Sequence, residues 1–225
     1  MPISNSLQKM GFYGIILKGE NMLKKIIVAT NNKNKAREIR EIMPQCEVLT
    51  LEDINFLDDI EENGETFLEN AIIKAKAISA LTDEVILADD SGLEVDFLNG
   101  APGVHSKRFA DSDNERIEKM LALLGGTPER KARFKCAVAL VRHGELIADF
   151  EGILEGSIAY SQSGNNGFGY DPIFIPDGYD VTLACLTADE KNRISHRGQA
   201  FTKFSESLTY PFTLKLLLAF KRGGI

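Results

Sequence analysis

The stretch from Val85 to Gly92, which reads VILADDSG, constrains the fold of this chain more than any other. Its short continuous apolar run is typical of a strand buried on both faces, as in an α/β sheet. Ligands of such sheets gather at the carboxyl ends of the strands, and ionised carboxylates are costly to bury unless a cation compensates them. The stretch therefore predicts a strand that ends in a turn at Asp89 and Asp90, beside a site for a divalent cation and a phosphorylated substrate.

The two adjacent carboxylates are not equivalent on this interpretation. On an extended strand Asp89 and Asp90 point to opposite faces, so we expect only one of them to enter a cleft. We assign this role to Asp90, which lies closer to the expected turn. The alternative is that both residues simply begin a polar turn.

Length, charge and cysteine content limit the classes of protein to which the chain can belong. Its 225 residues are enough for one large domain or a two-lobed one. The net charge of -7 and pI of about 5.1 argue against broad nucleic-acid binding, although a local basic pocket or a metal can still neutralise a nucleotide. No apolar run is long enough to span a membrane. Three cysteines without metal-ligand spacing indicate reduced thiols in a cytoplasmic protein.

The first 21 residues form a predicted extension that the fold does not need. Codons for Lys18–Asn21, just before Met22, can form a purine-rich run that resembles a bacterial ribosome-binding site. We therefore expect Met22 to be the native start, residues 1–21 to be dispensable, and residues 22–225 to form a single domain.

A basic segment near the start of the chain carries candidate ligands for an anion. A strand over residues 23–29 is followed by TNNKNK, which begins a helix that stops before Pro44, with Asn31 or Asn32 as the N-cap. Lys33 and Lys35 lie at the positive end of this helix, where cations are disfavoured unless an anion binds. The alternative is a solvated basic turn, and the segment is not a Walker loop because the glycines are missing.

The acidic loop that follows offers oxygen ligands. Glu61 and Glu62 precede Thr66, which begins a capping box and a helix over residues 67–80. Together with Asp89 and Asp90 they are candidate ligands for Mg²⁺, the alternative being a solvated loop. Further along we expect a strand or hairpin arm over 92–98 and a helix over 113–124. A strand over 132–141 and a turn at residues 143–145 should then lead to one or two strands over 146–160.

Two polar segments in the last third of the chain suit recognition of a base. In the glycine-rich loop around GFGYDP, Phe168 or Tyr170 can stack on a base while Asp171 accepts hydrogen bonds from it. Lys191, His196 and Arg197, among others, precede an amphipathic last helix and can donate to carbonyl or phosphate oxygens. The alternative for the glycine-rich loop is an ordinary turn whose aromatic residues anchor it to the core. The alternative for the second segment is that charged residues are common at the start of a helix.

Five segments in order are far more specific than any one of them: Thr30–Glu38, Gly64–Ala71, Ala88–Gly103, Gly167–Pro172 and Ile194–Arg197. Together they resemble the Ham1/RdgB/ITPA family of inosine and xanthosine triphosphate pyrophosphatases, over about residues 23–208. The resemblance implies an elongated, two-lobed α/β fold with a central mixed sheet flanked by helices and an active-site cleft between the lobes. It also implies a homodimer that uses Mg²⁺ to hydrolyse ITP, dITP or XTP to the monophosphate and pyrophosphate.

The resemblance also implies roles for matching residues. Asp90 is the expected proton acceptor and lies near the metal, Glu61 is the expected Mg²⁺ ligand, and Glu62 and Asp89 are possible helpers. The residues expected to contact the substrate are Thr30, Asn31, Asn32, Lys33, Asn34 and Lys35 at the triphosphate, Ser91, and Phe168, Gly169, Tyr170, Asp171, Lys191, His196 and Arg197 around the base.

The chain departs from the family pattern in its loops. Asn31 stands where the family often has glycine, fewer glycines precede the aromatic loop, and His105 and Lys107 replace common Tyr and Ala. The first two departures affect the expected loop geometry. Two other functions stay open: a pyrophosphatase of the related Maf type with another base preference, and a nucleotide-binding sensor without catalysis. A retained Asp90 argues against the sensor, which needs no general base.

Overall fold

The computed structural model describes residues 25–209, so the predicted extension over residues 1–21 lies outside the described residues. Within this range six strands form one sheet: β1 (Lys25–Val28), β2 (Glu47–Leu49), β3 (Ile86–Val95), β4 (Lys131–Arg142), β5 (Glu145–Ile158) and β6 (Phe174–Pro176). The α-helices of the same range are α2 (Lys33–Ile42), α3 (Phe67–Ser79), α4 (Asp113–Leu124), α5 (Ala188–Ile194) and α6 (His196–Thr209).

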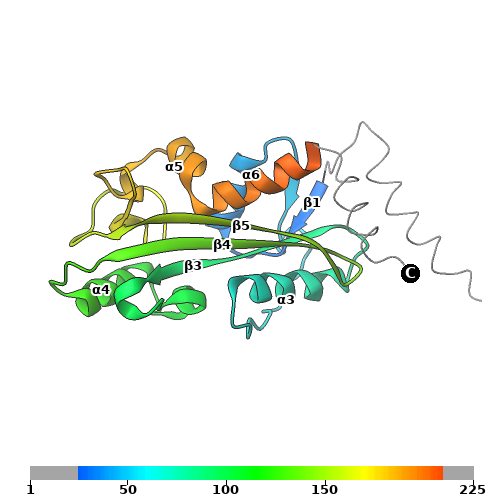
Figure 1. Cartoon of the computed structure of the whole chain (residues 1–225). Helices are drawn as coiled ribbons and strands as arrows, with labels where there is room; N and C mark the ends of the chain where they lie inside the picture. Colours follow the sequence, from blue (N-terminus) through cyan, green and yellow to red (C-terminus); the bar gives the residue numbers. More distant parts are fainter. Residues whose placement is uncertain (1–24, 210–225) are drawn as a thin grey trace, which may run out of the picture.

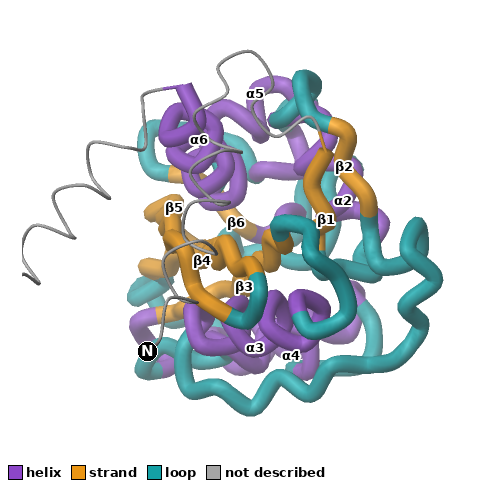
Figure 2. Tube along the Cα trace, turned by 90° about the vertical axis from the view of Figure 1, so that its right-hand side faces the viewer, coloured by secondary structure: helices purple, strands orange, loops and turns teal. Residues whose placement is uncertain are grey.

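The sheet is mixed, as predicted. Its strand order is β2-β1-β3-β4-β5-β6, with β1 parallel to β2 and β3, and antiparallel pairing from β3 to β6. Helices α2 and α6 cover one face and α3 and α4 cover the other, which gives an elongated three-layer molecule (Figures 1 and 2). The long β4–β5 hairpin closes through His143 and Gly144, both at positive φ, as the sequence indicates.

Apolar side chains explain why these helices pack where they do. On one face of the sheet Ile39 of α2 and Phe201 of α6 meet Val138 in one cluster, and on the other Ala75 and Ile78 of α3 lie in a second cluster. The helix starts also follow the sequence: Asn32 caps α2, and Thr66 and Glu69 form the predicted capping box of α3. Both faces of β3 are therefore covered, and any charged residue along it must find a partner.

The prediction that β3 ends at the two carboxylates is wrong. Asp89 and Asp90 lie in the middle of the strand, paired with Val138 and Ala137 of β4, and pairing continues to Val95. Gly92 is needed for a close approach rather than a turn, because a Cβ there would collide with the carbonyl oxygen of Gly103 and the hydroxyl of Ser106. The separate strand expected over residues 92–98 is the second half of β3 followed by a 3-10 turn.

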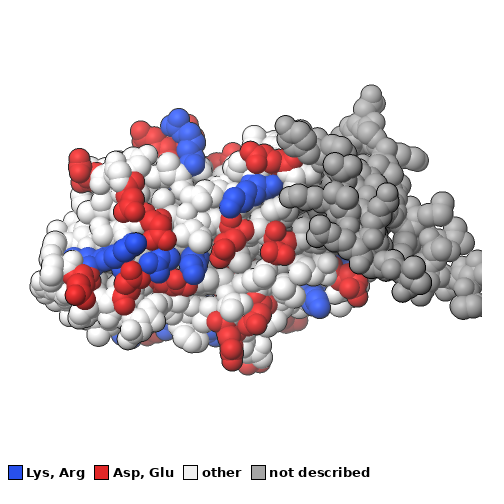
Figure 3. All heavy atoms as spheres, viewed as in Figure 1, with Lys and Arg blue, Asp and Glu red and all other residues white. Residues whose placement is uncertain are grey.

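The surface agrees with the acidic composition. The face shown in Figure 3 carries both acidic and basic side chains, and neither sign forms a continuous patch on it. A broad basic footprint of the kind that binds nucleic acid is therefore not present on that face. Among residues 25–209, no helix has the length and apolar character needed to cross a bilayer.

Candidate active site

Asp89 is the centre of a buried ion network on the α6 side of β3. Its side chain is fully buried, and one oxygen, Oδ2, accepts hydrogen bonds from Lys35 Nζ at 2.9 Å and from Arg197 Nη2 at 3.2 Å. Burial raises the pKa of Asp89, but the positive charges of Lys35 and Arg197 outweigh it and hold that pKa well below its usual value. The carboxylate is therefore ionised and joins a residue of the TNNKNK segment to a residue of the last helix.

The network continues from Arg197 to the aromatic loop through Glu38 of α2. Glu38 is buried and accepts from Arg197 Nη1 at 2.5 Å and from Lys191 Nζ at 2.7 Å. Lys191 in turn donates to Asp171 at 2.5 Å, and Arg197 also donates to Ser91 Oγ at 2.9 Å. Although burial raises the pKa of Glu38, the two cations lower it overall. Ion pairs thus hold together helix α2, the aromatic loop at Asp171, and the helices α5 and α6.

Asp90 faces the opposite side of β3, toward α3, as the extended-strand argument predicts. Its two oxygens accept from Asn70 Nδ2 at 3.3 Å and from Lys74 Nζ at 3.4 Å. Burial raises the pKa of Asp90, and the charges of Lys74 and Lys35 offset only part of that shift. A carboxylate with a raised pKa is a stronger proton acceptor than an ordinary aspartate, which suits general-base chemistry.

The acidic loop reaches this face through Glu62. Glu62 Oε2 lies 3.0 Å from Lys74 Nζ, so two carboxylates, those of Glu62 and Asp90, converge on one ammonium group. Glu61 is exposed. Among residues 25–209, no cluster of three or more His, Cys, Asp and Glu side chains is arranged to hold a metal by itself. Two carboxylates are nevertheless the usual protein share of a Mg²⁺ site that waters and substrate phosphates complete.

The expected triphosphate residues lie around the start of α2. Asn32 Oδ1 accepts from the main-chain N–H groups of Asn34 and Lys35, and the buried Thr30 accepts from Asn32 N–H at 3.1 Å. Asn31 is exposed. The lysines diverge: the Lys33 side chain is 86% exposed, whereas the Lys35 side chain is 15% exposed and points to Asp89. Only Lys35 of the two reaches the buried network described above.

The two aromatic residues of the loop have different surroundings. Tyr170 is buried in the core and its hydroxyl donates to the carbonyl oxygen of Ser106 at 3.0 Å, so its ring is not available to stack on a base. Phe168 is half-buried, its ring centroid lies 4.6 Å from Lys191 Nζ, and it is the better candidate to stack on a base. The main-chain N–H of Phe168 donates to Asp171.

His196 is the first residue of α6 and Arg197 is the second, so the polar segment expected before the last helix is partly α5 and partly α6. The His196 ring stacks on the Phe134 ring with centroids 4.7 Å apart, and His196 Nδ1 has no partner among the described residues. Burial and nearby cations hold the pKa of His196 well below its usual value, so the ring is neutral. Gly152 of β5 permits this placement, because a Cβ there would collide with the His196 carbonyl oxygen.

Sequence reasoning missed three buried polar residues of the site, namely Glu38, Asn70 and Lys74. The last two carry a signal that was available. Phe67, Asn70, Lys74 and Ile78 follow the spacing of one helix face, so two polar residues interrupt the apolar stripe of α3. Asn70 also accepts from the Gly64 N–H at 2.8 Å, which fixes the acidic loop beside Asp90.

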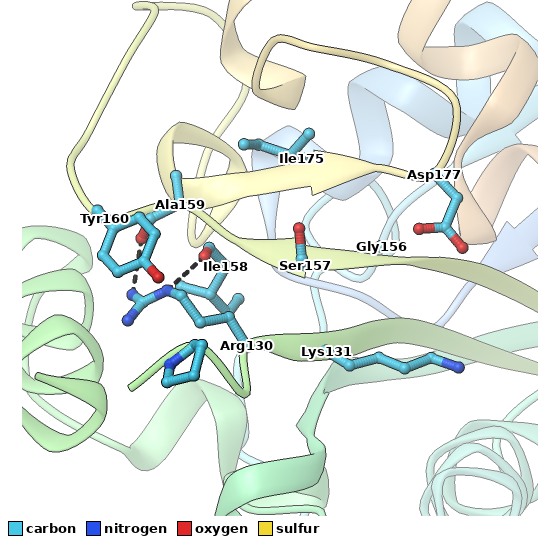
Figure 4. Close-up of a pocket in the computed structure, with 10 residues that line it drawn as sticks. Arg130, Lys131, Gly156, Ser157, Ile158, Ala159, Tyr160, Ile175 and Asp177 are labelled. Carbon is cyan, nitrogen blue, oxygen red and sulfur yellow. Dashed lines mark hydrogen bonds between the residues drawn. The ribbon is translucent and has the colours of Figure 1, made fainter. Parts of the chain in front are cut away.

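A groove of about 570 Å³ lies elsewhere on the molecule, at the ends of β4 and β5 (Figure 4). Lys131, which lines it, is six residues along β4 from the partner of Asp90, a distance of about 20 Å at the usual rise per residue. Arg130 beside it donates to the carbonyl oxygens of Ile158 and Ala159 and ties the strand ends together. None of the residues that line this groove belongs to the ion network. The groove is therefore not the predicted active-site cleft between two lobes, and that cleft stays a prediction.

Comparison with known proteins agrees with the geometry. The model of the Ham1 family matches residues 26–207. A protein of Bacillus subtilis named dITP/XTP pyrophosphatase is 46% identical over 194 residues, which are 83% of this chain and 98% of that protein. A Ham1 protein of Coxiella burnetii has a similar solved structure, with a TM-score of 0.76 and 43% identity over 84% of this chain and 99% of that one. The Staphylococcus aureus Ham1 protein gives a TM-score of 0.75 at 40% identity, over 83% and 98% of the two chains. The chain belongs to the Ham1 family.

Proposed function

We propose that the protein hydrolyses non-standard purine nucleoside triphosphates, namely ITP, dITP and XTP, to the nucleoside monophosphate and pyrophosphate. The observation that carries the proposal is the division of labour between two neighbouring residues of β3. Asp89 joins Lys35 to Arg197 on one face, and Asp90, with its raised pKa, stands beside Lys74 and Glu62 on the other. The name dITP/XTP pyrophosphatase, carried by relatives of 44–46% identity, supports the substrate class.

In the proposed reaction, Asp90 takes a proton from a water molecule whose oxygen bonds to the α-phosphorus. The anhydride bond between the α- and β-phosphates breaks, and pyrophosphate leaves with the electron pair. Asn70 holds one oxygen of Asp90, and Lys74 lies near the other. Lys35, whose Nζ donates to Asp89, would neutralise charge on the triphosphate.

The residues present fit a Mg²⁺ ion. Glu62 and Asp90 would hold it, because both already direct carboxylate oxygens at a positive charge, that of Lys74. When bound, such an ion neutralises the charge of the phosphates and of the leaving pyrophosphate. Glu61, the ligand predicted from the resemblance, is exposed next to Glu62 and stays a candidate ligand of the same ion.

Base selectivity rests on donors near the aromatic loop. Hypoxanthine and xanthine carry a carbonyl acceptor at the purine 6-position, whereas adenine carries an amino donor there. Within residues 25–209, carboxylates occupy two of the three N–H groups of Lys191, which leaves one for a 6-carbonyl beside the Phe168 ring. A donor left unpaired against adenine lowers affinity for ATP. Guanine also has a 6-carbonyl, so rejection of GTP requires a contact at the 2-position.

Lys35 is expected to act on binding of the triphosphate. We expect Lys35→Ala to raise KM for ITP by about tenfold or more, because it removes the one lysine of the segment that enters the network. Steady-state kinetics on Lys35→Ala and on Arg37→Ala, which removes an exposed charge of the same helix, measure this effect. Equal KM values for the two variants would remove Lys35 from the triphosphate site.

Three further properties belong to the same proposal. The protein acts as a homodimer in the cytoplasm, residues 22–225 form one domain, and residues 1–21 are dispensable for activity. The family match, which begins at residue 26, supports the domain assignment. Deletion of residues 1–21 should leave kcat/KM for ITP and the number of subunits determined by light scattering unchanged.

The first test of the function is release of pyrophosphate from ITP, XTP, dITP, ATP, GTP, CTP and TTP, each with Mg²⁺ and with a chelator. We expect release from ITP, dITP and XTP to exceed release from ATP and GTP by about 100-fold and to stop with the chelator. Release mainly from pyrimidine nucleotides would contradict the proposal and favour a Maf-type preference. Binding of ITP without release from any nucleotide would favour a sensor.

A further inference from the structure

Asp113, the first residue of α4, makes a contact that the start of a helix does not require. Ser112 and Glu115 already form a complete capping box for α4. The Asp113 carboxylate is therefore not used as the cap, and its Oδ2 accepts the main-chain N–H of Gly169 at 2.9 Å. Gly169 is next to Phe168 and has φ of +62°, a conformation that favours glycine. One oxygen of Asp113 thus fixes the main chain beside the proposed stacking ring.

Arg116, one helical turn further along α4, orients that carboxylate. Its Nη2 donates to Asp113 Oδ1, and its Nη1 donates to the carbonyl oxygens of Lys107 at 2.7 Å and Ala110 at 3.1 Å. The guanidinium therefore fixes Asp113 relative to the segment that ends the 3-10 helix Gly103–Arg108. Because both carboxylate oxygens are used, rotation of the side chain breaks at least one contact.

The same segment holds the loop at the following residue. The Tyr170 hydroxyl donates to the carbonyl oxygen of Ser106, and the Ser106 hydroxyl accepts from Leu93 N–H of β3. The loop is thus attached at two adjacent residues, Gly169 and Tyr170, to residues 106–116. The Phe168 ring itself makes no side-chain hydrogen bond, so its position over Lys191 follows from the main chain to which it is attached.

We propose that Asp113 is a positioning residue that determines base specificity, because it holds the Gly169 main chain and thereby sets the place of the Phe168 ring against the purine. This inference rests on the proposed function, since it names the residue that aligns the base-binding loop of the same site. It requires no contact between Asp113 and the substrate. Removal of its carboxylate leaves the Gly169 N–H and Nη2 of Arg116 without their acceptor, whereas Nη1 keeps the carbonyl oxygens of Lys107 and Ala110. The loop then moves relative to Lys191.

The test compares Asp113→Ala, Asp113→Asn and, as the matched control, Asp111→Ala, an exposed carboxylate two residues earlier. We expect Asp113→Ala to raise KM for ITP about tenfold with kcat within about threefold, and to raise the ratio of GTP to ITP turnover about fivefold. Asp113→Asn keeps an acceptor for the Gly169 N–H, so its KM for ITP and its ratio of GTP to ITP turnover should return most of the way to the wild-type values. A merely structural loss lowers the active fraction and leaves the KM and the base ratio unchanged.

Amide hydrogen exchange gives a readout that does not need activity. Exchange in the peptide that contains residues 168–170 should be at least about tenfold faster in Asp113→Ala than in Asp111→Ala. Equal exchange, or an unchanged base ratio in an active Asp113→Ala protein, overturns the inference. Failure of the wild-type chain to hydrolyse ITP instead contradicts the proposed function, and the exchange result then decides alone whether Asp113 fixes the loop.

Discussion

Asp90→Asn should lower kcat for ITP by about 10³-fold while leaving the protein folded. The amide has nearly the shape of the carboxylate and can still accept a hydrogen bond from Asn70. It cannot take a proton from water, and it is a weaker ligand for a divalent cation. Pyrophosphate release at saturating ITP measures the effect, and Asp59→Asn, which removes an exposed charge from the acidic loop, is the control.

The stability of this variant is expected to move in the opposite direction from its activity. The pKa of Asp90 is raised in the folded protein, so its ionised form is destabilised by folding at neutral pH. Substitution with Asn removes that cost, and the urea midpoint at pH 7 should equal or exceed that of the wild type. Retention of more than about a tenth of wild-type kcat would exclude Asp90 as the general base.

The sequence predicts the longer helices and strands because the deciding signals are local, whereas the short elements β2, β6 and α5 are not predicted. The capping box of Thr66 and Glu69 and the turn at His143 each act over a few neighbouring residues, and each has the predicted role. Of the two N-caps predicted for α2, the structure selects Asn32. The end of β3 was misplaced because Gly92 signals both a turn and a close approach. Only the three-dimensional packing against Gly103 and Ser106 decides between these two.

In the candidate site, too, the features that depend on neighbouring residues could be predicted and the long-range pairings could not. Alternation along a strand is enough to place Asp89 and Asp90 on opposite faces, and the structure confirms it. The partners of each carboxylate come from elsewhere in the chain: Lys35 is 54 residues away and Arg197 is 108 residues away. No local pattern encodes such pairings. For the same reason Glu38, which joins two cations of the last third of the chain, could not be recognised from α2 alone.

Asp89→Asn should destabilise the protein at pH 7 by about 3–5 kcal/mol, the usual effect of removing one partner of a buried ion pair. Lys35 would lose the carboxylate that faces it, and the fully buried Arg197 would keep one carboxylate, that of Glu38, and the hydroxyl of Ser91. Asp90→Asn is the matched control, since it makes the same chemical change at the next residue of the strand.

The pH dependence separates this electrostatic effect from a packing defect. The folded-state pKa of Asp89 is depressed below its usual value of 3.8, so its stabilisation is fully present above that value and is lost as pH falls toward the folded-state pKa. The free energies of unfolding of wild type and Asp89→Asn, measured with urea at pH 7, 5, 4 and 3, should differ by a constant amount down to about pH 5 and converge below about pH 4. A difference that stays constant to pH 3, or one no larger than that of Asp90→Asn, would show that Asp89 does not hold the two cations in place by its charge.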